Sequence, residues 1–171
     1  MLCKTAIAQA SKALLACDTA LAGELPDILM EVNRKERDIE LLCMRLLLQQ
    51  QPVARDLQAV SAALKMVTDM DHICVQSANF AEIVAMGHIT QIPDVLPLRG
   101  MAEAVMKMVK ESVDAFVKQD SKIAKAVIEY DDVVDDYFNQ CKAVLIHLLR
   151  QPHPNGEAVI DLLMIAKYFE L

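Results

Sequence analysis

Apolar residues recur along this chain every three to four positions, which is the spacing of one face of an α-helix. The pattern is interrupted where Gly, Pro, Gln and Asp gather, around residues 23–26, 51–52, 87–97, 119–120 and 151–156. We therefore predict six helices, over about residues 2–21, 25–50, 52–86, 95–118, 121–150 and 155–171. Pro52 suits the first position of the third helix, because a helix makes no use of the backbone N–H there.

The composition favours helices over sheets. Hydrophobic residues make up 54% of the 171 positions, with ten Met, no Trp and 4% aromatic residues. Strands are rich in β-branched and aromatic residues, whereas Ala, Leu, Met and Glu suit helices. We predict an all-α protein that is long enough to bury a substantial core.

Charge and cysteine usage narrow the function classes. The net charge is −7 and the chain has no long basic run, which argues against binding the phosphate backbone of nucleic acids. The five cysteines are widely spaced without a Cys-x-x-Cys pair, so we interpret them as reduced core residues. No apolar run is long enough to span a membrane, and the start lacks a signal-peptide layout, so we expect a cytoplasmic protein.

Three acidic residues fall within the apolar stripes of predicted helices: Asp71, Asp131 and Glu170. A carboxylate that leaves water without a partner is strongly destabilising. Each of the three must be protonated, paired with a base, bound to a cation or turned toward solvent. The three acids are therefore the first candidates for a functional site. By contrast, Glu129, Asp132 and Asp136 project away from the stripe and indicate a solvated face.

The two halves of the chain carry similar features about 100 residues apart. Gln51-Pro52 recurs as Gln151-Pro152, and Asp71 has a counterpart 99 residues later in Glu170. Two units of three helices each, residues 1–89 and residues 90–171, are the simplest explanation. We expect the second unit to be incomplete in its last helix.

One stretch resembles the signature of a known family, the PhoU regulators of bacterial phosphate uptake. It covers residues 36–71 and reads ERDIELLCMRLLLQQQPVARDLQAVSAALKMVTDMD, of which QQPVARDL is the most specific part. The second half carries similar segments, IEYDDVVDDYF at 128–138 and LLMIAKYFE at 162–170. The resemblance covers almost the whole chain and implies two three-helix bundles related by pseudo-twofold symmetry.

The resemblance also implies a function. PhoU proteins link the phosphate ABC transporter, through its ATPase subunit, to a phosphate-sensing histidine kinase, and they damp the phosphate-starvation response when phosphate is plentiful. We accordingly expect a cytoplasmic regulator that is not an enzyme and that forms a homodimer. The sequence itself shows no nucleophile–base arrangement and no glycine-rich phosphate loop.

Some PhoU proteins bind divalent metals or iron clusters through acids on the second and third helices of each repeat. In the first repeat, Asp71 matches the first acid of the third-helix motif, but Val75 replaces the second acid. On helix two, Leu29 stands where the family usually has Asp, although Glu36 remains. The resemblance thus implies at most a reduced metal site of Glu36 and Asp71 in this half.

The second repeat keeps more of the metal motif. Asp131 and Asp135 match the acids of helix two, and Glu170 matches the first acid of the third-helix motif. The chain stops at Leu171, before the rest of that motif. Residues four apart share one helix face, so acids on facing helices could share a divalent cation. We name Asp131, Asp135 and Glu170 as the candidate ligands in this half.

Other interpretations stay open at this point. Asp71 could pair with a basic residue or face a solvent groove, and His72 could pair on the surface with Asp69, three residues before it. A metal-binding helical bundle with a storage or di-metal redox role is the alternative function. A ferritin-like site would need a Glu-x-x-His pair, and the sequence contains none. A helical adaptor that binds no metal is the third possibility.

Overall fold

The computed structural model describes residues 2–49 and 53–171, which fold into helices without a strand. The helices are α1 (Leu2–Ala16), α2 (Thr19–Ala22), α3 (Leu25–Gln49), α4 (Ala54–Ala85), α5 (Leu98–Lys118), α6 (Ser121–Leu149) and α7 (Gly156–Glu170). The prediction of an all-α protein is confirmed. The predicted place of Pro52 at the start of a helix lies outside the described residues.

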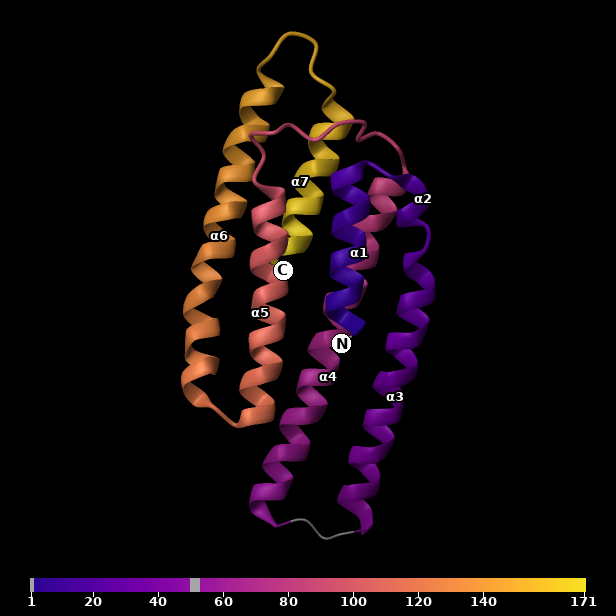
Figure 1. Cartoon of the computed structure of the whole chain (residues 1–171), viewed down its shortest axis with the longest axis vertical. Coiled ribbons are helices and arrows are strands. Elements are labelled where there is room, and N and C mark those ends of the chain that lie inside the picture. The colour runs from indigo at the N-terminus through magenta and orange to yellow at the C-terminus, as the bar shows by residue number, and fades with distance from the viewer. Residues whose placement is uncertain (1, 50–52) are drawn as a thin grey trace.

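The long helices run side by side along the longest axis of the molecule (Figure 1). The hairpins α3–α4 and α5–α6 form the two flanks, and α1 and α7 lie between them. α1 packs against α3, α4 and α5, while α7 packs against α4, α5 and α6. Each half of the chain therefore places one of its helices against the other half.

The helix predicted over residues 2–21 is interrupted. α1 ends at Ala16, and Cys17 then adopts a left-handed backbone with φ of +50°. The Asp18 carboxylate accepts hydrogen bonds from the backbone N–H groups of Ala20 and Leu21, at 2.9 and 3.1 Å. Asp18 is thus the N-cap of α2. The sequence-based prediction missed this turn.

The same turn occurs in the second half. Gln119 has φ of +52°, and the Asp120 carboxylate caps α6 through the backbone N–H groups of Lys122 and Ile123, at 2.8 and 3.4 Å. Cys17 and Gln119 are 102 residues apart, close to the spacing of the other repeated features. The internal repeat therefore includes this turn: the left-handed residue is Cys in one half and Gln in the other, but the capping residue is Asp in both.

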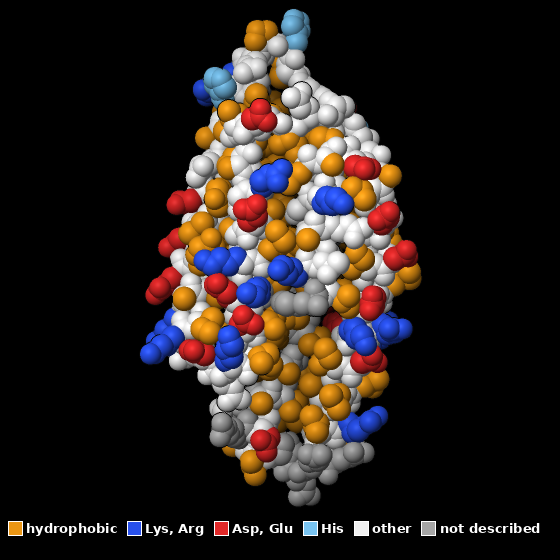
Figure 2. All heavy atoms as spheres, viewed as in Figure 1, with side chains coloured by type: hydrophobic (Ala, Val, Ile, Leu, Met, Phe, Trp, Pro, Cys, Tyr) orange, Lys and Arg blue, Asp and Glu red, His pale blue; other side chains and the backbone are white. Residues whose placement is uncertain are grey.

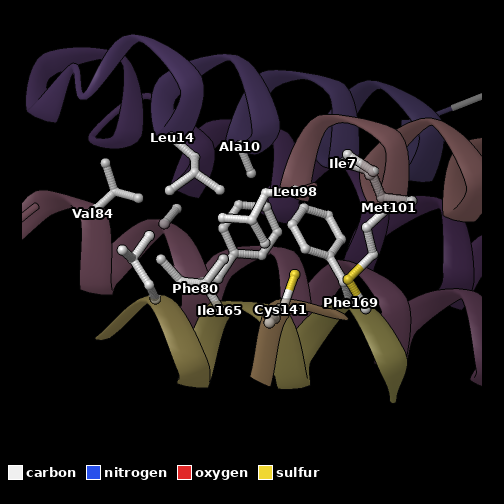
Figure 3. Packing of buried hydrophobic residues seen from close by; sticks show 14 of the residues in the cluster. Ile7, Ala10, Leu14, Phe80, Val84, Leu98, Met101, Cys141, Ile165 and Phe169 are labelled. Atoms are coloured by element: carbon white, nitrogen blue, oxygen red, sulfur yellow. The ribbon is translucent and has the colours of Figure 1, made fainter. Parts of the chain in front are cut away.

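Both halves contribute to one continuous core (Figure 3). Its buried side chains include Ile7 from α1, Phe80 from α4, Met101 from α5, Cys141 from α6 and Phe169 from α7. The rings of Phe80 and Phe169 meet across the two halves with centroids 4.9 Å apart and a tilt of 41°, a favourable aromatic geometry. The division at residue 89 stays a prediction about the repeat, since the core itself spans both halves.

One region lies beyond this core. The lower part of the α3–α4 hairpin, residues 39–49 and 53–67, extends past the end of α1 (Figure 1). We call it the α3–α4 arm. Apolar side chains gather on it in Figure 2, and Leu41, Leu48 and Val53 are 65%, 78% and 68% exposed. The arm is therefore an apolar surface on a protein whose core lies elsewhere.

Candidate functional site

The first pair of predicted acids does come together. Glu36 on α3 and Asp71 on α4 are both half-buried, on two helices that pack against each other. Burial, and then the negative charge of Asp71, raise the pKa of Glu36 above its ordinary value of 4.5. Two carboxylates thus repel each other at the contact between α3 and α4.

The two positions that lack the family's acids have ordinary structural roles. Leu29 is half-buried and packs against a small cluster of buried residues formed by Cys3, Ala6, Val32 and Cys74. Val75 is 45% exposed on α4. An apolar side chain at Leu29 therefore adds to packing between α1, α3 and α4, where a carboxylate would need a partner.

The acids of the second half are arranged differently from the sequence-based expectation. Asp131 and Asp135 are exposed on α6, although Asp131 was placed on an apolar stripe. Its neighbours on that stripe, Val127 and Val134, are buried. The stripe is therefore real, but at Asp131 it faces an open groove instead of the core.

That groove brings Asp131 and Glu170 to one surface. It has a volume of about 300 Å³, and Asp69 also lines it, among apolar residues of α4, α5 and α7. Glu170 is half-buried and forms an ion pair with Lys167, one turn earlier in α7. The ammonium group of Lys167 also lies 5.4 Å from the centre of the Phe138 ring. Glu170 thus has a base as its partner, and Asp135 does not line the groove.

The predicted metal ligands do not fit a site with three protein ligands. Within residues 2–49 and 53–171, no group of three or more His, Cys, Asp or Glu side chains is placed to hold a metal ion. Glu36 and Asp71 supply two carboxylates in one half, and Asp131 and Glu170 supply two in the other. Tight binding of a hard divalent cation usually needs more donors than this. Metal binding at these acids stays a prediction from the sequence.

A second groove of about 500 Å³ lies beside the first, between α1, α4 and α7. Its polar residues on α4 are Asp69, His72, Gln76 and Ser77, and Phe80 and Phe169 also line it. The surface pair expected between Asp69 and His72 is replaced by an ion pair of Asp69 with Lys65 at 2.6 Å. The two grooves together form the concave surface between the halves.

Some contacts had no signal in the sequence. Nδ1 of His88, just after α4, lies 2.9 Å from a carboxylate oxygen of Asp161 on α7, although the residues are 73 positions apart. Cys3 and Cys74 also meet, from α1 and α4. Both pairs depend on the packing of α1 and α7 between the two hairpins, which residue spacing does not predict.

Comparison with known proteins identifies the fold. The model of the PhoU domain matches residues 1–84 and 98–171. Over 99% of its length the chain is 31% identical to the "Phosphate-specific transport system accessory protein PhoU homolog" of Aquifex aeolicus, and the match covers 77% of that protein. The homolog of the same name from Pseudomonas aeruginosa is 30% identical over 84% of this chain and 60% of its own length.

Solved structures agree with these matches. The crystal structure of PhoU from Pseudomonas aeruginosa superposes with a TM-score of 0.90 at 27% identity, covering 99% of this chain and 82% of that one. The phosphate transport system regulatory protein PhoU from Streptococcus pneumoniae gives a TM-score of 0.80 at 23% identity, which supports the fold. In its sequence, its helical repeat and its three-dimensional fold, this chain belongs to the PhoU family.

Proposed function

We propose that this protein regulates phosphate uptake and phosphate-starvation signalling as a helical adaptor. Its relatives are named accessory proteins of the phosphate-specific transport system, which supports a non-enzymatic role in that system. The two partners are the ATPase subunit of the phosphate ABC transporter and a phosphate-sensing histidine kinase. In this proposal the protein acts in the cytoplasm and damps the starvation response when phosphate is plentiful.

The observation that carries the adaptor role is the apolar surface of the α3–α4 arm. Leu41, Met44 and Leu48 are spaced at three and four residues, so they share one face of α3. They are 65%, 49% and 78% exposed. A contiguous exposed apolar face on a protein with a separate core is typical of a protein-binding surface. No helix in the described part of the chain is long and apolar enough to cross a membrane.

Binding to the purified ATPase subunit tests this proposal. We expect the double variant Leu41→Gln/Leu48→Gln to bind the subunit at least about tenfold more weakly, because it removes two central apolar contacts. The matched control is Ile128→Gln/Ile160→Gln, which changes two residues that are 73% and 60% exposed on α6 and α7. In calorimetric titration, the control variant should bind the ATPase subunit with the same affinity as the wild type. If the arm variant and the wild type bind with equal affinity, the α3–α4 arm is not the surface that binds the ATPase subunit.

The proposed homodimer is tested separately. The exposed apolar side chains of the arm offer a surface that a second copy could cover. Sedimentation velocity across the micromolar range should show a concentration-dependent dimer. A monomer at every concentration would reject the dimer while leaving the binding of the ATPase subunit open to its own test.

A further inference from the structure

Two buried cysteines from distant parts of the chain lie together near the start of α1. Cys3 is the second residue of α1 and is 5% exposed, whereas Cys74 on α4 is fully buried. They share a small cluster with Ala6 and Val32. The fold thus joins two thiols that are 71 residues apart in the sequence.

Their contacts are specific. The thiol of Cys3 donates a hydrogen bond to the backbone carbonyl oxygen of Met70, at 3.6 Å, one helical turn before Cys74. Cys3 and Cys74 also belong to the same small cluster of buried side chains, between α1 and α4. Cys141 differs, because the pKa of its buried thiol is raised to about 11 by burial alone. Cys3 and Cys74 therefore form a thiol pair, which the core cysteine Cys141 does not share.

We infer that Cys3 and Cys74 form a reversible oxidation site, at which a low-molecular-weight disulfide such as oxidised glutathione converts the two thiols into a disulfide between α1 and α4. The inference goes beyond the proposed adaptor function. It also extends the sequence-based interpretation of the cysteines, since a reduced thiol pair is the starting state of this reaction.

The reaction consists of two thiol–disulfide exchanges. The thiolate of Cys3 attacks one sulfur of the small disulfide, breaks its S–S bond and releases one thiolate, leaving Cys3 in a mixed disulfide. The thiol of Cys74 loses its proton and attacks the sulfur of Cys3, which releases the second small thiolate. Two protein thiols lose two electrons and two protons, and one small disulfide becomes two small thiols.

The surroundings give the two cysteines different roles. Cys3 is 5% exposed whereas Cys74 is fully buried, so a small oxidant reaches Cys3 first. The neighbouring Cys74 thiol lowers the pKa of Cys3, whereas the neighbouring Cys3 thiol and burial raise the pKa of Cys74. Local opening of the packing between α1 and α4 exposes Cys3 to the oxidant. Cys3 is thus the attacking residue and Cys74 the resolving one.

The disulfide would fix the first turn of α1 to the middle of α4. Asp71 lies three residues before Cys74 on α4, and the charges of Asp71 and Glu36 both act on the Cys74 thiol. Oxidation would therefore restrain the helices that carry the carboxylate pair of the first half. It would leave the α3–α4 arm unchanged, since neither cysteine belongs to the arm.

Mass spectrometry of the full chain tests the inference directly. After incubation of the folded protein with excess oxidised glutathione, we expect an intact mass lower by two hydrogen atoms. A non-reducing digest should contain one linked pair of peptides, carrying Cys3 and Cys74, that a reducing agent separates. The inference is overturned if these thiols stay unmodified under conditions that oxidise a reference dithiol peptide. It is also overturned if other cysteines form the main linked peptides.

Single-cysteine variants distinguish the attacking role of Cys3 from the resolving role of Cys74. Cys74→Ala should stop the reaction at the mixed disulfide and leave one glutathione on Cys3, whereas Cys3→Ala should prevent both products. Cys141→Ala is the matched control, because it alters a fully buried cysteine outside the pair and should keep the wild-type yield of linked peptides. Circular dichroism verifies that each variant is folded. The linked peptides of the wild type test the inference even if a variant does not fold.

Discussion

At the scale of single residues, the acids show what a carboxylate does when its helix position is apolar. Glu170 is paired with Lys167, Asp131 faces an open groove, and Glu36 lies in a like-charge contact with Asp71. Two of the outcomes that physics allows for such acids, pairing with a base and facing solvent, thus occur in one protein. The charge of Asp71, by contrast, acts unfavourably on Glu36.

Replacing Glu36 should therefore stabilise the protein. The folded state raises the pKa of Glu36, so the charged form of Glu36 lowers the stability of the folded protein at pH values above that pKa. This destabilisation disappears as the pH falls below the ordinary pKa of 4.5, because Glu36 is then protonated in both the folded and the unfolded state. We expect Glu36→Gln to raise the free energy of unfolding by about 0.5 kcal/mol at pH 7, with no gain at pH 4. Urea unfolding at both pH values measures this. A gain that persists at pH 4 would mean that charge is not its cause.

The metal prediction also belongs to single residues. Because the described donors do not form a group of three, we expect metal-stripped protein to bind divalent cations only weakly. Restoring the family's acids in the double variant Leu29→Asp/Val75→Asp should add donors beside Glu36 and Asp71 and tighten binding. Calorimetric titration compares the two proteins. Stoichiometric tight binding by the wild type that Asp131→Ala abolishes, and Asp132→Ala preserves, would instead establish a site in the second half.

At the scale of helices, both halves start their second helical segment with the same turn. A residue with left-handed backbone, Cys17 or Gln119, precedes an Asp that caps the next helix. We expect Asp18→Ala and Asp120→Ala each to lower the free energy of unfolding by about 1 kcal/mol, as the loss of an N-cap does. Urea denaturation measures both. Asp94→Ala, at an exposed loop position, is the control that should leave stability unchanged.

The helices also show how far the sequence predicts this fold. Apolar spacing correctly predicted the long helices, because their buried stripes run over many turns. It missed the break at Cys17, since Cys has no preference for a left-handed backbone, although Asp18 was a visible capping signal. It placed Asp131 on the correct stripe but not in the groove, and it gave no sign of His88 meeting Asp161. Such contacts depend on how helices pack across the halves.

At the scale of the whole molecule, the two repeats share one core. The contact of Phe80 with Phe169 joins α4 of the first half to α7 of the second. We expect Phe169→Ala to lower the free energy of unfolding by about 3–5 kcal/mol through a single cooperative transition. Ile160→Ala, on the exposed side of α7, should change it by less than about 0.5 kcal/mol. Circular dichroism that shows two separate transitions would contradict the shared core.

We propose that this member of the PhoU family holds back the phosphate-starvation response when phosphate is plentiful. The most direct measurement is the activity of a starvation-response reporter in high phosphate, in cells that lack the gene and in cells that regain it. We predict high reporter activity in the deletion strain, low activity with the wild-type chain, and high activity with Leu41→Gln/Leu48→Gln. A reporter that stays low in the deletion strain would contradict the account.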